Sequence, residues 1–456
     1  MRILMVRPKP SPETIGLQHL MIVEPLELEI LCALKRETDS VIVVDMILEE
    51  RSFESFILEH RPDLLCVTGY ITNVQTIISY CEKTKNLSNK ITTIVGGVHC
   101  EVCPEDFDRD AIDFRVVRNA AKIFTDLLNH IDAKTEIPQG VLKKGELLKN
   151  IQLLPFDFKV PFPDREAVSR YRHKYFYIFQ DKVALIKTSF GCPYSCTFCF
   201  CRTITDGLYF QRPITEVMKE LEQIKEKEIY IVDDDFLVDR KRLQSFIFEV
   251  KQRKIEKHYL VYGRADFIAK NQDVIHELAL IGLKTVIVGF ESFTDKELDL
   301  YNKNTSAEMY KKTMLVLHRE KIDCFATIII PPEWDKKDFR NMVKAVKSLG
   351  IHFVNLQPLT PLPKTGISYP ESQIIIDRTQ FDKWDLAHIS VRPTSLSVSE
   401  FYKEILKAYN SIVYNPKVIW KYIISYNPIM LCRMIAGGIR VSKQYRHKIK
   451  ESAQYA

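Results

Sequence analysis

What the sequence lacks narrows the class of protein. None of the apolar stretches in its 456 residues reaches the length of a membrane span, and the apolar run after Met1 is far too short for a secretory signal. The 65 Lys and Arg residues are nearly balanced by 59 Asp and Glu residues, and the basic residues form no stripe. These absences predict a soluble cytoplasmic protein and argue against nucleic acid as the main partner.

A fourth cysteine is also missing. Cys192, Cys196 and Cys199 form a CxxxCxxC pattern, and no fourth cysteine lies at a matching distance; Cys201 is too close to Cys199 to form another corner. In a reducing compartment the 11 cysteines should be mostly thiols or metal ligands. Three thiolates can hold three irons of a [4Fe-4S] cluster and leave the fourth open to a small molecule. The alternatives are three structural thiols or a zinc site, which normally requires a fourth Cys or His.

Residues 1–135 predict a doubly wound α/β domain with a parallel sheet. Short β-rich runs alternate there with helical patterns, as in βαβ units. Ligands of such sheets bind beyond the carboxyl ends of the strands. The candidate loops are 7–16, 69–73 and 96–104.

The rest of the chain divides into three further parts. Residues 136–180 carry several prolines and predict a linker, whereas 181–385 contain six β-rich runs, each followed by a helical pattern. Six such units predict a partial (βα)6 barrel with its active site at the carboxyl ends of the strands. Residues 386–456 should be helical, with Ser397 and Glu400 at the spacing of a capping box. Within them, 418–439 should pack on the barrel, with contact to a membrane surface as the alternative.

The cysteine triplet directly follows the first predicted barrel strand, and Phe198 gives it an apolar neighbour. This arrangement resembles the radical S-adenosylmethionine (radical SAM) superfamily. The resemblance implies that S-adenosylmethionine chelates the open iron and that an electron from the cluster cleaves it, releasing a 5′-deoxyadenosyl radical. It also implies cofactor contacts around the triplet and at the ends of later strands, for which the candidates are Phe198, Asp233, Asp234, Arg264 and Glu291.

The segments 62–73 and 94–105 look like the cobalamin-binding domain that is fused to many radical SAM enzymes. The resemblance implies a corrin near Thr68, Thr72, Gly96, Gly97 and His99. Two features depart from the pattern. The DxHxxG motif is absent, and residues 118–122 replace a Gly-Glu-Gly-Glu-like turn. His99, Cys100 and Cys103 also admit a second metal site as an alternative.

The leading hypothesis is an enzyme that uses a [4Fe-4S] cluster, S-adenosylmethionine and cobalamin to methylate an unactivated carbon of a small molecule or lipid in a biosynthetic pathway. One alternative keeps the radical but not the methyl group, giving deoxygenation or dehydration, cyclisation or C–C bond formation, with an N-terminal domain that lacks cobalamin. Another is an electron carrier or sensor. Expected partners are an electron donor such as flavodoxin or ferredoxin and, through the C-terminal region, a membrane surface.

Overall fold

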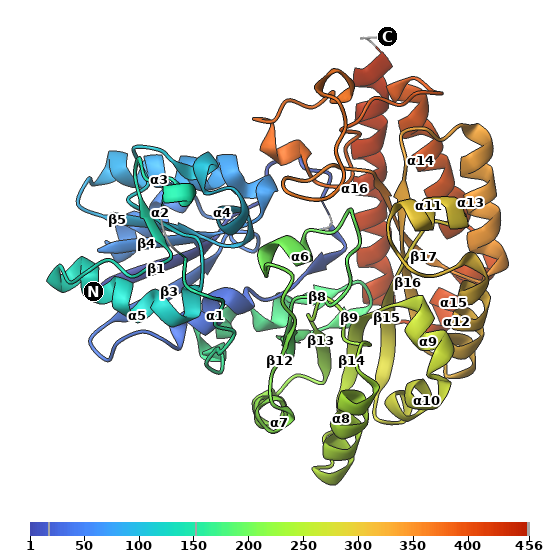
Figure 1. The fold of residues 1–456 in the computed structure, drawn as a ribbon, viewed down its shortest axis with the longest axis horizontal. Helices are drawn as coiled ribbons and strands as arrows, with labels where there is room; N and C mark the ends of the chain where they lie inside the picture. The colour runs from blue at the N-terminus through green and yellow to red at the C-terminus, as the bar shows by residue number, and fades with distance from the viewer. Residues whose placement is uncertain (17–18, 151–152, 454–456) are drawn as a thin grey trace.

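The structure, a computed structural model, describes residues 1–16, 19–150 and 153–453. Two α/β units lie side by side (Figure 1). The N-terminal unit is drawn in blue and cyan, the barrel unit runs from green to orange, and the red C-terminal helices pack against the barrel. The predicted α/β class, with a doubly wound domain followed by a partial barrel, is confirmed.

The N-terminal sheet has six strands in the order β3-β1-β4-β5-β6-β7. Their bounds are β3 Ser40–Asp45, β1 Arg2–Arg7, β4 Leu64–Thr68, β5 Thr92–Gly96, β6 Phe114–Val116 and β7 Val141–Lys143. The helices of this unit are α1 Leu26–Cys32, α2 Phe53–His60, α3 Val74–Leu87, α4 Val98–Val102 and α5 Ala120–Ala133. Both faces of the sheet bury apolar side chains, which explains why strands such as Ile-Leu-Met-Val read as continuous hydrophobic runs.

The edge strand β7 differs from the expectation, because it lies inside the segment predicted as a linker. It pairs antiparallel with β6, whereas the other strands of this sheet are parallel. Only three residues long, it carries too little alternation to be recognised in a sequence. The same segment contains the 3-10 helix η5 (Arg165–Lys174) and the short strands β8 (Phe176–Tyr177) and β9 (Gln180–Asp181).

The barrel unit has six parallel strands, as predicted, in the order β10-β13-β14-β15-β16-β17. They are β10 Ala184–Ile186, β13 Glu228–Ile231, β14 His258–Gly263, β15 Leu283–Glu291, β16 Asp323–Ile330 and β17 Phe353–Pro358. The helices around them are α7 Ile214–Gln223, α8 Arg240–Gln252, α9 Ala265–Lys270, α10 Gln272–Leu280, α11 Asp295–Leu300, α12 Ala307–Arg319 and α13 Lys336–Ser348. Strands β10 and β17 end the row, so the barrel is open on one side.

The concave face of this open barrel has its own apolar core. Strand residues such as Leu260 and Phe325 point into it and meet Phe179 from the β8–β9 hairpin. Leu26 from near the N-terminus and Leu431 from the last helix join the same core. Segments from both ends of the chain therefore fill the inside of the sheet.

Three helices end the chain: α14 (Val398–Val413), α15 (Pro416–Ser425) and α16 (Pro428–Ala453). The capping box predicted from Ser397 and Glu400 is present at the start of α14. Helix α16 packs along α14, and Ser399 Oγ donates to the carbonyl oxygen of Ile449 at 2.9 Å. Within the described residues, no helix is both long and apolar enough to cross a membrane.

Candidate functional site

The three cysteines lie on the loop between β11 (Ser189–Phe190) and α6 (Cys201–Ile204), just beyond the carboxyl end of β10. All three are partly exposed thiols. Gly191 opens the loop with a φ of +74°, and a Cβ atom there would collide with the carbonyl oxygen of Leu208. A hydrogen bond from Cys201 lowers the pKa of the Cys199 thiol, which favours the thiolate that an iron ligand needs.

Asp233 anchors the strand that leads into this loop. Its Oδ1 accepts from the backbone nitrogens of Thr188 and Ser189 at 2.6 and 2.9 Å, and its Oδ2 accepts from the Ser189 hydroxyl at 2.8 Å. The carboxylate is 1% exposed, so these contacts fix the turn that precedes Cys192. A direct contact between Asp233 and S-adenosylmethionine remains a prediction.

Arg264, a predicted cofactor residue, lies against the cysteine loop. Its Nη1 lies 3.9 Å from Cys196 Sγ, and its guanidinium carbon lies 4.1 Å from the centre of the Tyr194 ring. Asp266 accepts from its Nε at 2.9 Å, and the carbonyl oxygen of Lys303 accepts from its Nη2. The guanidinium is thereby held beside the cluster loop, where it can bind a carboxylate.

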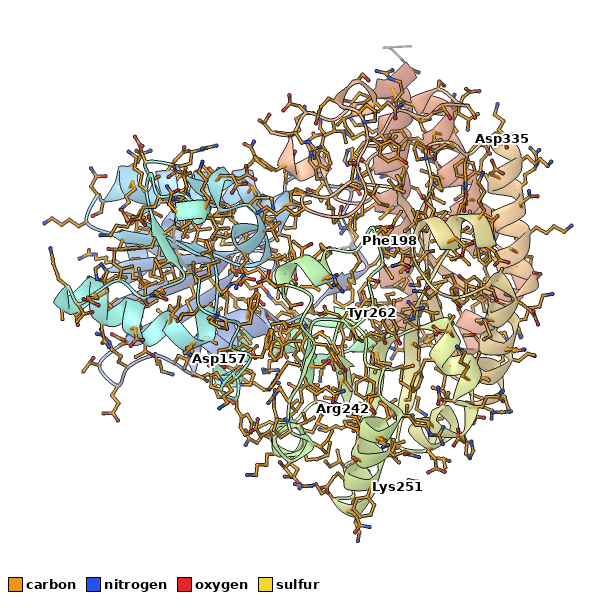
Figure 2. The ribbon with its side chains drawn as sticks, in the orientation of Figure 1. Asp157, Phe198, Arg242, Lys251, Tyr262 and Asp335 are labelled. Carbon is orange, nitrogen blue, oxygen red and sulfur yellow. The ribbon has the colours of Figure 1, made fainter. Side chains whose placement is uncertain are left out.

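Glu291 and Phe198 converge on Lys303. Glu291 Oε1 accepts from Lys303 Nζ at 2.8 Å, and both side chains are 8% exposed. Glu291 has a φ of +62°, an uncommon conformation for a residue with a side chain, at the carboxyl end of β15. The Phe198 ring packs edge-on against Tyr301 and lies 5.9 Å from Lys303 Nζ. Figure 2 labels Phe198 and Tyr262 in this central part of the molecule.

The sequence did not single out Lys303 or Tyr194, although both contact the predicted residues. Lys303 lies between two helices in an Asn-Lys-Asn stretch, which reads as an ordinary polar loop. Tyr194 lies inside the cysteine motif at a position that the spacing leaves open. A search for charged residues near strand ends would miss Lys303, because it lies 12 residues after Glu291.

A cavity of about 280 Å³ lies between the two units. Leu28, Ile94, Val116 and Leu127 give its N-terminal part an apolar lining. Both units contribute its other lining residues, among them Glu27, Thr68, Gly96, Gly97, Glu101, Asn119, Asp157, Lys187, Gly191, Thr205 and Asp234. Burial raises the pKa of Glu101 to about 7.

Gly97 shapes the polar end of the cavity. Its φ is +94°, and a Cβ atom would collide with Thr68 Oγ1 and the backbone of Gly69. The missing side chain lets two strand ends approach closely and leaves backbone facing the cavity. Thr68, Gly96 and Gly97, predicted to contact a corrin, therefore line one cavity together with the predicted Asp234.

Thr72 and His99 are not among the described residues that line this cavity. His99 is 4% exposed, bonds to Asp106 through Nε2 at 2.7 Å and packs against Phe107 and Phe381. The metal-ligating atoms of His99, Cys103 and Asp106 lie within 4.8 Å of one another, close enough to hold a metal ion. The hydrogen bond between His99 and Asp106 explains the close approach of these two residues without a metal. A corrin contact by either residue remains a prediction.

The linker packs against residues 118–122, which stand where the acidic turn is expected. Arg118 stacks on Phe156 at 4.0 Å, and Asn119 bonds to the backbone of Pro155 and Asp157. Phe158 stacks in turn on Phe156, Phe190 and Phe210 at 5.4 to 5.6 Å. Phe156, Asp157 and Phe158 line the cavity, and Figure 2 shows Asp157 beside the N-terminal unit. The altered turn thus holds an aromatic wall along one side of the cavity.

The site residues fit the cofactors that the sequence implies. Burial raises the pKa of the Cys196 thiol, and the positive charges of the nearby Lys303 and Arg264 act against that rise. The same charges can attract a carboxylate. The cavity supplies an apolar slot and an open glycine edge, as a large flat ligand with a nucleotide tail requires.

Comparison with known proteins supports both assignments. The Radical SAM superfamily model matches residues 186–346, and the B12 binding domain model matches residues 14–128. The chain is 26% identical to the hopanoid C-3 methylase of Methylococcus capsulatus, over 92% of this chain and 81% of that protein. It is 24% identical to the bacteriochlorophyllide d C-8(2)-methyltransferase of Chlorobaculum tepidum, over 76% of each chain.

Among solved structures, the radical S-adenosylmethionine methyltransferase TsrM from Kitasatospora setae, with cobalamin and a [4Fe-4S] cluster bound, has a TM-score of 0.69 at 15% identity. The alignment covers 100% of this chain and 99% of TsrM, so the two share their whole fold. The two matching models show that the chain carries a radical SAM domain, with a B12-binding domain ahead of it.

Proposed function

We propose that this enzyme methylates an unactivated carbon of a small molecule or lipid in a biosynthetic pathway. One observation carries the proposal. A single cavity is lined by the B12-domain residues Thr68 and Gly97 and by Lys187, Gly191 and Asp234 beside the cysteine loop. A corrin held there would face the site of the cluster. Two relatives named as methylases, which match most of this chain, support the same reaction.

When bound, the cluster and S-adenosylmethionine supply hydrogen-abstracting radical chemistry, and cobalamin supplies the methyl group. The chain's own residues orient and shield these groups. Cys192, Cys196 and Cys199 would hold the cluster, and Arg264 would bind the carboxylate of S-adenosylmethionine. Glu291, fixed by Lys303, would accept from ribose hydroxyls. Phe158 and Phe190 would exclude water between the two cofactors.

The runner-up is a radical transformation without methyl transfer, such as a deoxygenation or cyclisation. The replaced acidic turn favours it, because Arg118 and Asn119 bind the linker there. In this alternative the linker would fill part of the space that a corrin needs.

We further propose the working context of the enzyme. A small redox protein such as flavodoxin or ferredoxin would reduce the cluster, and the reaction would take place in the cytoplasm. The C-terminal region would contact a membrane surface.

A test begins with anaerobically reconstituted protein, dithionite and S-adenosylmethionine. We expect 5′-deoxyadenosine from the parent chain and from Cys201→Ala, but none from Cys196→Ala, because Cys196 is assigned as an iron ligand and Cys201 is not. Release by Cys196→Ala would contradict the radical assignment. Corrin absorption together with S-adenosylhomocysteine formed under turnover would support methyl transfer, whereas 5′-deoxyadenosine without S-adenosylhomocysteine would favour the runner-up.

A further inference from the structure

An unusual concentration of exposed apolar side chains lies on the last two helices. The α15–α16 face consists of Ile419, Trp420, Ile423, Ile424, Ile429, Ile435 and Ile439. Trp420 and Ile424 are each 66% exposed and Ile429 is 73% exposed. Single exposed apolar residues are ordinary, but seven of them on two consecutive helices indicate a binding surface.

The outward side of α16 changes character along its length. Exposed residues recur every three or four positions, first as Ile429, Cys432, Ile435 and Ile439 and then as Arg440, Lys443, Arg446 and Lys450. Its inward side buries Gly437 and Tyr445 against the rest of the molecule. The apolar half covers about 15 Å of helix, which is too short to span a bilayer but suits a helix lying at its surface.

The charge of this region has one sign. Residues 405–450 contain no Asp or Glu, whereas they contain Lys407, Lys417, Lys421, Arg433, Arg440, Lys443, Arg446, Lys448 and Lys450. Arg433 pairs with Asp181, and Lys448 pairs with Glu13. In the described parts of the chain, Arg440, Lys443, Arg446 and Lys450 have no acidic partner. Free cations beside an apolar face complement an anionic lipid surface.

We propose that the α15–α16 face docks the enzyme on a bilayer that contains anionic lipid, with Trp420 and the isoleucines at the headgroup–acyl boundary and the cations of α16 against the headgroups. This deepens the membrane contact proposed above and is independent of which radical reaction the enzyme performs. A twofold interface between two copies of the chain is disfavoured, because it would place the basic residues of one α16 close to those of the other. Tryptophan is also the side chain enriched at membrane interfaces.

The three tryptophans allow a direct test. Trp334 and Trp384 are 7% and 2% exposed, so Trp420 is the one that lipid can reach. The full reconstituted chain is mixed with vesicles of phosphatidylcholine alone or with phosphatidylglycerol added, and with brominated analogues of these lipids. We expect flotation with the anionic vesicles, loss of flotation at high salt, and quenching of Trp420 fluorescence by bromolipid.

Matched variants separate the two parts of the surface. Ile423→Asn with Ile424→Asn should weaken vesicle binding about tenfold or more, and each of Lys443→Gln and Arg446→Gln should weaken it about fivefold. Leu315→Asn and Lys311→Gln, on exposed positions of α12, are the controls and should bind like the parent chain.

Each contrary result overturns the proposal. Anionic vesicles that neither float the chain nor quench Trp420 would do so. Sedimentation showing a dimer that Ile423→Asn with Ile424→Asn dissociates would assign the face to a second copy instead. Thermal unfolding of every variant checks that the fold is intact, and 5′-deoxyadenosine release, measured without vesicles, separates failure to dock from failure of the radical chemistry.

Discussion

At the scale of single residues, buried charge decides how the site behaves. Lys303 and Glu291 neutralise each other where neither has much contact with water. Breaking such a pair from one side leaves an unpaired charge, which costs more than removing both partners.

We expect Lys303→Met to lower the free energy of unfolding by about 3–5 kcal/mol. Lys303→Met combined with Glu291→Gln should recover much of that loss, because no charge is then left alone. Chemical denaturation of the metal-free chain measures both, with exposed Lys296→Met as the control. If the double variant is as unstable as the single one, the loss of stability does not come from the unpaired charge of Glu291.

Glu101 gives the cavity a dependence on pH. Burial raises its pKa to about 7 from an ordinary value of 4.5, so in the folded chain the carboxyl ionises as pH rises through 7. Its contribution to stability is therefore largest below pH 4.5 and declines up to about pH 7.

A ligand that fills the cavity removes further water from Glu101, so we expect the affinity for hydroxocobalamin to fall between about pH 6 and about pH 8. Glu101→Gln should bind with little change across this range. Absorption titrations at several pH values measure the effect. If the affinity of the parent chain and that of Glu101→Gln fall equally with pH, the pH dependence comes from another group.

At the scale of elements, η5 joins three parts of the chain through a buried ionic network. Arg165 pairs with Glu24 at 2.7 Å and with Glu220 of α7 at 2.8 Å, and Arg172 pairs with Glu24 at 2.7 Å. Glu29 of α1 lies in the same network, where burial and the neighbouring Glu24 raise its pKa to about 10. Glu29 therefore remains protonated in the folded chain at neutral pH.

The unfolded chain loses this proton near pH 4.5, so the folded state loses stability as pH rises from there toward 10. Glu29→Gln removes this dependence. We expect the free energy of unfolding of the variant to rise relative to that of the parent chain by up to about 1.4 kcal/mol for each pH unit over that range. Thermal unfolding at about pH 6 and about pH 9 tests it, and a constant difference between the two proteins would count against the raised pKa.

At the scale of the whole molecule, Phe158 connects the linker to the barrel unit through ring contacts with Phe190 and Phe210. It also stacks on Phe156, which packs against Arg118 of the N-terminal unit. We expect Phe158→Ala to keep its iron content but to bind hydroxocobalamin about tenfold more weakly, because one wall of the cavity is lost. Proteolysis in the linker should become faster. Phe248→Ala, at an exposed position of α8, is the matched control. Unchanged corrin affinity would show that the wall does not shape the cavity.

The sequence predicted the elements whose signals are local. The sequence predicted six barrel strands, the N-terminal alternation and the Ser397 cap because each depends on the hydrophobic period or spacing of neighbouring residues. It did not predict contacts between segments that are far apart in the chain. Lys303 meets Glu291 only after a helix has turned back, and Phe156 meets Arg118 only when the linker folds over the sheet. Thr72 and His99 follow the right strands, yet neither is among the described residues that line the cavity, since strand order does not fix the direction of a side chain.

The core inside the open barrel also determines when the barrel can finish folding during synthesis. Leu26 enters it from the first helix, and Leu431 enters it from the last. A chain still being synthesised cannot seal this core until α16 has left the ribosome. Until then the cysteine loop belongs to a domain whose interior core is incomplete.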